Sequence, residues 1–293
     1  MSGEGYFPRG SSILRRVHDE RLVGLFYGQR ALCIGALMPL NYVGTMAHTH
    51  WRDRLFQRLA HTAEQFETVY FGTRAQADAL LVRVHRMHRQ VHGTLPFDAG
   101  ATAKGTAYDA FNPELMLWTV AIIAESALHF YELFIGRLSD AEREAYWQDY
   151  LRFGELFGTP RESCPRTYVE FRQWWDAQLN SELMYLTEEA RYVGHATAFR
   201  IPLPPLHQPF TLAHNAIQLG SLPPVVREHY GLRYGPADRL AYAAAVAGIR
   251  AGRIVTPDLL AKGSSAIFYR QIAVSEARRI ARDQAPVKLA GRF

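Results

Sequence analysis

The chain has 293 residues, of which 48% are apolar and 21% charged, a composition typical of a folded globular protein rather than a disordered one. Its formal charge is +5, but 30 arginines and 3 lysines are spread along the chain among acidic residues, which argues against a nucleic-acid-binding surface. Cys33 and Cys164 have no disulfide or metal-ligand spacing, and residues 1–16 lack an apolar signal core, so we expect a cytoplasmic protein.

Three helices are predicted in the first third of the chain, at residues 24–46, 54–71 and 74–91. Pro39 interrupts the first helix, Gly72 ends the second, and Thr73 caps the third. We expect Gly93 to follow the third helix in the left-handed conformation, which glycine adopts at little cost. Residues 1–19, which precede all three helices, are expected to form an extended tail.

Residues 93–110 are mostly small and polar, so they are predicted to form a loop, which could serve as a lid. Asn112 then marks a helix start, because it is a good capping residue and is followed by a proline and a glutamate. The helix over residues 115–134 is apolar but carries two glutamates and a histidine, which are costly inside a lipid bilayer. It is therefore predicted to be a buried core helix and not a stable membrane span.

Two further helix starts are predicted where a serine or threonine is followed three residues later by glutamate, at Ser139 and Thr167. A cluster of prolines then breaks the chain at Pro202, Pro204, Pro205 and Pro209. Helical patterns return at residues 236–250 and 266–282, before an expected extended tail at 284–293. No stretch alternates polar and apolar residues as a strand would, so the sequence predicts a single all-α domain over residues 1–293.

The apolar stripe of the helix predicted at 74–91 shows which of its histidines faces inward. The stripe is formed by Ala77, Leu80, Leu81, Val84, Met87 and Val91. By helical-wheel arithmetic His88 lies roughly 50° from the centre of the stripe, whereas His92 and His85 lie roughly 90° and 110° away. His88 is therefore predicted to point into the core. A lone inward histidine is more often a hydrogen-bonded core residue than a metal ligand, so periodicity leaves both roles open.

The helix predicted at 54–71 has a polar group beside its apolar stripe. The stripe is formed by Leu55, Leu59, Phe66, Val69 and Tyr70, with Thr62 within it. Arg58 lies between Thr62 and His61 on the wheel, so the three side chains can line one wall. An arginine beside an apolar stripe is costly unless it meets an anion. The ordinary alternatives are an ion-paired surface arginine and a threonine bonded to its own helix.

Several blocks of the sequence resemble, in order, the family that joins the fungal oxygenase MpaB to the catalytic domain of bacterial latex-clearing protein. The blocks are residues 54–62, 69–73, 84–93, 108–118, 138–143, 146–147, 154–158 and 222–232. The resemblance covers about residues 20–280. It implies a helical fold with a globin-like core that encloses one non-covalently bound b-type haem.

The resemblance also implies roles for individual residues. The histidine that binds the haem iron in latex-clearing protein looks like His88, and the Arg-x-x-Lys-Thr motif of that enzyme falls on Arg58, His61 and Thr62. His61 thus replaces a lysine, and it could bind the iron as a second, distal ligand, donate a hydrogen bond to bound O2, or line the pocket. Trp118 and Ile122, with Phe130, are expected to wall the haem and substrate pocket.

By resemblance, the expected function is that of a haem-b-dependent oxygenase that uses O2 to oxidise a hydrophobic small molecule. Residues 29–48 contain no acidic side chain that could serve as the catalytic glutamate proposed for the latex enzymes, which argues against rubber cleavage.

Three alternatives remain open. If both His88 and His61 bind the iron, the protein is a closed bis-histidine haem carrier or sensor. A non-haem metal enzyme would use Glu125, His129 and Glu132, which share one helix face, although a second Glu-x-x-His motif is absent. The third alternative is a scaffold that binds no haem at all.

Overall fold

The computed structural model describes residues 4–284, and it confirms the predicted all-α fold class for that part of the chain. The helices are α1 (Ile13–Asp19), α2 (Arg21–Gly35), α3 (Pro39–His48), α4 (Leu55–Phe71), α5 (Arg74–His88), α6 (Pro113–Phe134), α7 (Asp140–Phe157), α8 (Tyr168–Leu179), α9 (Glu188–Phe199), α10 (Gln208–Ser221), α11 (Pro224–Tyr230), α12 (Pro236–Val255), α13 (Asp258–Ala261) and α14 (Ala266–Ala281). Two short strands, β1 (His92–Thr94) and β2 (Ala107–Asp109), form a hairpin between α5 and α6.

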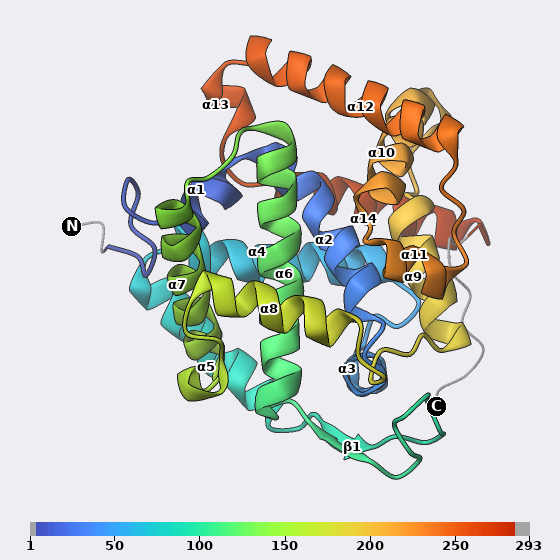
Figure 1. The fold of residues 1–293 in the computed structure, drawn as a ribbon. Coiled ribbons are helices and arrows are strands. Elements are labelled where there is room, and N and C mark those ends of the chain that lie inside the picture. The colour runs from blue at the N-terminus through green and yellow to red at the C-terminus, as the bar shows by residue number, and fades with distance from the viewer. Residues whose placement is uncertain (1–3, 285–293) are drawn as a thin grey trace.

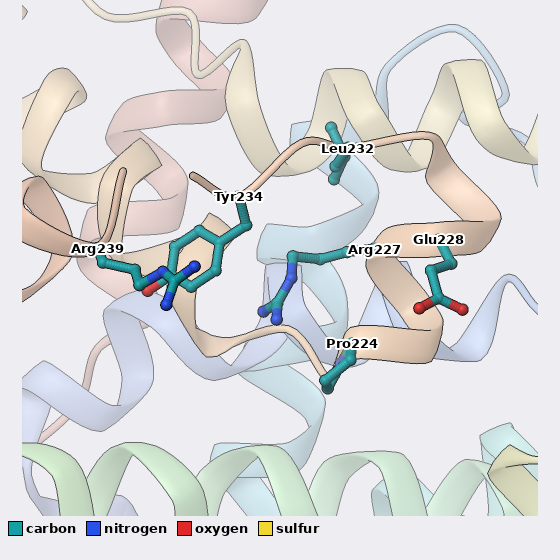
Figure 2. A pocket seen from close by; sticks show the side chains of 6 residues that line it. All are labelled: Pro224, Arg227, Glu228, Leu232, Tyr234 and Arg239. Carbon is teal, nitrogen blue, oxygen red and sulfur yellow. The ribbon is translucent and has the colours of Figure 1, made fainter. Parts of the chain in front are cut away.

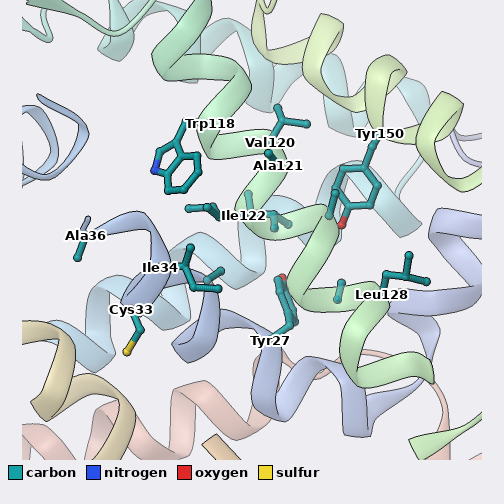
Figure 3. Packing of buried hydrophobic residues seen from close by; sticks show 14 of the residues in the cluster. Tyr27, Cys33, Ile34, Ala36, Trp118, Val120, Ala121, Ile122, Leu128 and Tyr150 are labelled. Carbon is teal, nitrogen blue, oxygen red and sulfur yellow. The ribbon is translucent and has the colours of Figure 1, made fainter. Parts of the chain in front are cut away.

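Helix α6 runs through the middle of the molecule, with α2 and α7 packed along it (Figure 1). The Asn112 side chain accepts hydrogen bonds from the backbone N–H groups of residues 114 and 115, as predicted for its cap. Trp118 and Ile122 of α6 face Ile34 of α2 in the core (Figure 3). Within residues 4–284, α6 is long and apolar enough to cross a membrane, as is the sharply bent pair α2 and α3 taken together. Because 67% of the most apolar window of α6 is buried, it packs as a core helix.

The segment before residue 20 does not form the extended tail that the sequence predicted. Residues 13–19 form α1, which buries Leu14, Val17 and His18 against the rest of the protein. Phe7 is also buried, and its ring packs edge-on against that of Tyr70, with 6.4 Å between the ring centroids. The prediction failed because a short helix with only two turns gives little periodic signal. All but the first residue of the tail expected at 284–293 lies outside the described part of the chain.

The loop predicted at residues 93–110 is confirmed for residues 95–106, but the two ends of this stretch form strands, which the sequence did not predict. Gly93 pairs with Tyr108 in the antiparallel hairpin, and α5 already ends at His88. Gly93 does not have the positive φ that the sequence predicted. A Cβ atom there would lie 2.6 Å from the Tyr108 hydroxyl oxygen, so close packing against the tyrosine explains the glycine.

The later helices agree with the capping signals. Ser139 and Glu142 form the predicted capping box of α7, and the Thr167 side chain accepts from the backbone N–H of Glu170 at 3.2 Å. Helix α12 extends five residues beyond the predicted end at 250, and α14 ends one residue short of 282. Helices α9 and α10 flank the proline cluster and α11 follows them, and none of the three was predicted.

Candidate functional site

Helices α4 and α5 carry the predicted site residues and are joined by a turn of only two residues, Gly72 and Thr73. The two helices then lead to different neighbours. Two backbone N–H groups in the first turn of α4 donate to the carboxylate of Glu276 on α14, at 3.2 and 2.9 Å. In the last turn of α5, the His85 side chain donates from Nε2 to the carbonyl oxygen of Leu156 on α7, at 3.0 Å. The ends that hold Arg58 and His88 are therefore anchored on separate parts of the fold.

His88 continues the buried stripe of α5. Ala77, Leu80, Leu81 and Val84 are buried, and His88, one turn further, is partly buried on that side. Met87 was expected in the stripe but is 49% exposed, because the helix ends at the next residue and no element covers it. The His88 ring packs edge-on against Phe111, with 5.8 Å between centroids.

The electrostatics of His88 suit a metal ligand. Its Nδ1 atom is buried and has no hydrogen-bond partner among the residues that the structure describes. Burial, with a smaller contribution from His85, lowers the pKa of His88, so its imidazole is neutral near pH 7. A neutral imidazole has a free nitrogen lone pair, which is the form that binds iron. A buried, unpartnered ring nitrogen is unusual for a histidine with a structural role only.

Arg58 lies on α4, three residues before His61. Its side chain is partly buried, and Nη1 donates to the sulfur of Met46 at 2.9 Å, a weak acceptor. Burial lowers the pKa of Arg58, and no carboxylate forms an ion pair with it within residues 4–284. A cation in this position is costly unless an anion joins it. Thr62, one turn along the helix, is also partly buried.

His61 lies on the outer side of α4. It is exposed, its ring packs edge-on against Trp51 with 4.8 Å between centroids, and its Nε2 lies 3.0 Å from Nε2 of Gln65. No contact joins His61 to His88 or to Arg58 in the described structure. The fold thus separates the two histidines that the sequence pairs.

Trp118 and Ile122 lie one turn apart on the face of α6 that meets α2 (Figure 3). Trp118 is fully buried, stacks on Trp175 with 5.5 Å between centroids, and donates from Nε1 to the carbonyl oxygen of Gly35. Ile122 packs so closely on Gly35 that a Cβ there would lie 2.6 Å from its Cδ1. Phe130, two turns further, packs on Phe26 instead. All three side chains are thus buried in the apolar core around α6.

An acidic group that sequence reasoning missed is hydrogen-bonded to Tyr42, a residue whose pKa is affected by Arg58. Glu189 of α9 accepts a hydrogen bond from the Tyr42 hydroxyl at 3.0 Å and one from Arg52 at 2.7 Å. Burial and the nearby Glu189 carboxylate raise the pKa of Tyr42, while Arg58 and Arg52 oppose this. Tyr42 is therefore hydrogen-bonded to Glu189 of α9 and interacts electrostatically with Arg58 of α4. No local signal could have found it, since Glu189 is 147 residues from Tyr42 in the chain.

The two glutamates of the alternative metal site on α6 form ion pairs with arginines. Glu125 accepts hydrogen bonds from the buried Arg30 on both carboxylate oxygens, and Glu132 pairs with Arg143 at 2.8 Å. Across residues 4–284, no three histidine, cysteine, aspartate or glutamate side chains are arranged to hold a metal ion. A non-haem metal site on α6 is therefore not supported.

A surface pocket of about 410 Å³ lies away from these residues, between α11 and the start of α12 (Figure 2). It is lined by Pro224, Arg227, Glu228, Leu232, Tyr234 and Arg239. The Arg227 guanidinium stacks over the Tyr234 ring at 4.5 Å and donates to the carbonyl oxygen of Leu222. Arg227 thus has a structural role in holding the α11 turn.

Comparison with known proteins identifies the family. The model for the ER-bound oxygenase mpaB/B'/rubber oxygenase catalytic domain matches residues 15–251. Uncharacterized proteins of Mycobacterium bovis and Mycobacterium tuberculosis are each 29% identical to the chain over 161 residues, which is 54% of this chain and 60% of each relative. No solved structure is significantly similar. The family match covers α1 to most of α12, including every candidate site residue, and the chain therefore belongs to the mpaB/rubber oxygenase catalytic-domain family, a family of oxygenases.

Proposed function

We propose that this protein is a haem-b-dependent oxygenase that acts on a hydrophobic small molecule with O2 as co-substrate, and that His88 binds the haem iron. The observation that carries the proposal is the state of the His88 ring, which is partly buried and neutral near pH 7. Its buried Nδ1 has no hydrogen-bond partner in the described chain. The energetic cost of that unpartnered nitrogen is readily explained if the ring has a ligand to bind.

Arg58 and Thr62 are the residues proposed to hold the other polar parts of the haem. Arg58 forms no ion pair in the described chain, and only the more distant Glu276 carboxylate acts on it, so a haem propionate would add a charge-assisted hydrogen bond. Haem bound between α4 and α5 would supply an iron centre that activates O2. Trp118 and Ile122 would exclude water on the α6 side, which favours an apolar substrate.

Glu189 and Tyr42 are proposed as the pair that handles protons near Arg58. The Tyr42 hydroxyl donates to the Glu189 carboxylate, and Arg52 holds the same carboxylate in place. When the Tyr42 oxygen accepts a proton from a reacting group, the proton that Tyr42 already shares with Glu189 can pass to the Glu189 carboxylate, so the pair can act as a general base. The acid that residues 29–48 lack is thereby supplied from α9.

The position of His61 favours the oxygenase over the closed bis-histidine alternative. His61 is exposed and contacts Trp51 and Gln65, so His88 rather than His61 is the histidine that would hold the iron. An open position is what an oxygen-using enzyme requires. We propose that His61 acts at the rim of the pocket.

Absorption spectroscopy of the purified, haem-reconstituted protein tests the proposal. The wild type and His61→Ala are expected to show a Soret band whose ferrous form shifts with carbon monoxide. His88→Ala is expected to lose haem, whereas the control His85→Ala, which changes a histidine one turn away, is expected to keep it. A wild type without a Soret band, or a His88→Ala spectrum identical to that of the wild type, would refute the iron assignment. A six-coordinate wild type that becomes five-coordinate in His61→Ala would establish the bis-histidine alternative.

A further inference from the structure

The pocket between α11 and the start of α12 is separate from the residues proposed to hold the haem (Figure 2). Its volume of about 410 Å³ lies within the range of small-molecule pockets. Pro224 and Leu232 give the pocket an apolar part, whereas Arg227, Tyr234 and Arg239 bring hydrogen-bond donors to it. A molecule that uses both parts needs an apolar body and a group that accepts hydrogen bonds.

The Arg227 guanidinium is held in place, unlike that of an ordinary surface arginine. Its side chain is partly buried, and Nη1 donates to the carbonyl oxygen of Leu222 and, at 3.4 Å, to that of Leu219 at the end of α10. The guanidinium also lies over the Tyr234 ring, 4.5 Å from its centroid. Because these contacts fix Arg227 before any ligand arrives, binding through it would cost little side-chain entropy.

One edge of the Arg227 guanidinium has no partner within residues 4–284. Both backbone hydrogen bonds come from Nη1, which leaves Nε and Nη2 free. These two nitrogens form one edge of the group, and their N–H bonds are nearly parallel. That edge matches two oxygens of one carboxylate or phosphate group, the geometry of bidentate recognition. The free edge therefore points to an oxyanion as the ligand.

Arg239 and Tyr234 bring further donors to the pocket from the chain around the start of α12. Arg239 is exposed and forms no ion pair in the part of the chain that the structure describes, and the Tyr234 hydroxyl has no hydrogen-bond partner there. Asp238, next to Arg239, accepts a hydrogen bond from the backbone N–H of Gly235 at 2.8 Å. Two cations thus line one pocket, and an anion bound between them would relieve their repulsion.

Glu228 also lines the pocket and limits the kind of anion that fits. It forms no ion pair with Arg227 or Arg239 in the described structure. In Figure 2 its carboxylate lies on the other side of Arg227 from Arg239. With two arginines and one glutamate the lining has a net positive charge, but the glutamate would repel a ligand that is negative along its whole length. The charge of the ligand should therefore be confined to one end.

We infer that this pocket binds a small organic anion, with its carboxylate or phosphate group between Arg227 and Arg239 and its apolar part against Pro224 and Leu232. The oxygens would accept charge-assisted hydrogen bonds from the two guanidinium groups and a further one from the Tyr234 hydroxyl. No residue that lines the pocket belongs to the candidate haem site, so the inference is independent of the proposed oxygenase function.

Isothermal titration calorimetry of the full chain with benzoate, phenyl phosphate and inorganic phosphate tests the inference. The wild type is expected to bind one molecule of benzoate or phenyl phosphate per chain, and the tighter of the two identifies the anionic group. Inorganic phosphate has no apolar part to pack on Leu232, so it is expected to bind at least ~10-fold more weakly. Equal affinity for inorganic phosphate would indicate an adventitious ion only and would overturn the assignment of an organic ligand.

Substitutions of the arginines test their roles. Arg239→Met removes a cation without breaking any side-chain contact of the described structure, and it is expected to weaken binding of the tighter probe by about 10- to 100-fold. Arg227→Lys keeps the charge and a donor for the Leu222 carbonyl oxygen but lacks the bidentate edge, so a similar loss is expected. The control Arg233→Met removes an exposed arginine that does not line the pocket and should leave the affinity unchanged.

Three results would overturn the inference. They are a wild type that binds neither organic anion at millimolar concentration, an Arg239→Met protein with wild-type affinity, and an Arg233→Met protein that loses as much affinity as Arg239→Met. Unchanged circular dichroism would show that each variant folds. Since Arg239 makes no contact that holds the fold together, its substitution keeps the test valid even if Arg227→Lys disturbs the end of α10.

Discussion

Replacing Arg58 with methionine is expected to change two properties of the protein in opposite directions. In the haem-free protein the Arg58 cation is partly buried and its hydrogen bond goes to the Met46 sulfur, a weak acceptor. Full burial of an unpaired ion costs several kcal/mol, so removing a partly buried one is expected to raise the free energy of unfolding by about 1–2 kcal/mol. Methionine keeps much of the side-chain volume, so little packing is lost.

Haem binding is expected to respond the other way. A hydrogen bond to a charged group contributes about 1.5–3 kcal/mol, so the loss of the Arg58 contact should weaken haem affinity roughly 10- to 100-fold. Urea unfolding of the haem-free protein, followed by circular dichroism, measures the first effect, and titration with haem measures the second. Arg86→Met removes the same charge from an exposed position on α5 and should change neither quantity. A less stable Arg58→Met protein, or one with wild-type haem affinity, would refute the reasoning.

Two further predictions concern buried ionisable side chains elsewhere in the fold. Burial lowers the pKa of His18 to about 3, below the unfolded value, so its contribution to stability is complete above about pH 6.5 and is lost as the pH falls toward 3. The wild type should therefore lose about 2 kcal/mol more than His18→Phe between about pH 6.5 and 5, and equal pH slopes in urea unfolding would contradict this. Arg30→Met leaves the largely buried Glu125 carboxylate with only Arg172, 3.9 Å away, and should cost about 3 kcal/mol at neutral pH, less as acid protonates the carboxyl. Adding Glu125→Leu should restore most of that loss in the same assay, and a double variant no more stable than the single one would show that the pair is not coupled.

Local signals predicted the parts of the fold that depend on neighbours in the chain. The caps at Asn112, Ser139 and Thr167 correctly located the starts of α6, α7 and α8, because a capping side chain bonds within its own first turn. The helical wheel also identified the inward side of α5, because the buried positions of one helix repeat with its own period. His88 could be singled out for that reason.

Features that depend on distant partners could not be predicted. Gly93 was explained by backbone conformation, whereas the structure requires it for the approach of Tyr108 from the other strand of the hairpin. Glu189 reaches Tyr42 from another helix, and its own surroundings in the sequence are unremarkable for a helix start. The ion pair between Arg30 and Glu125 likewise joins α2 to α6. Each charge compensates the other, so both side chains can be buried in the core.

The unequal positions of the motif residues on α4 follow from helix geometry alone. A step of three residues rotates by roughly 300°, so His61 lies about 60° from Arg58, on the side away from the buried stripe, whereas Thr62 lies about 40° from Arg58 toward it. The structure agrees, since Arg58 and Thr62 are partly buried and His61 is exposed. To bind an iron held by His88, His61 would have to turn inward, and that rotation would carry Leu59 and Ala63 out of the core. Each buried apolar side chain exposed in this way would cost about 1–3 kcal/mol, which is why Arg58 and Thr62, rather than His61, are the α4 residues proposed to hold the haem.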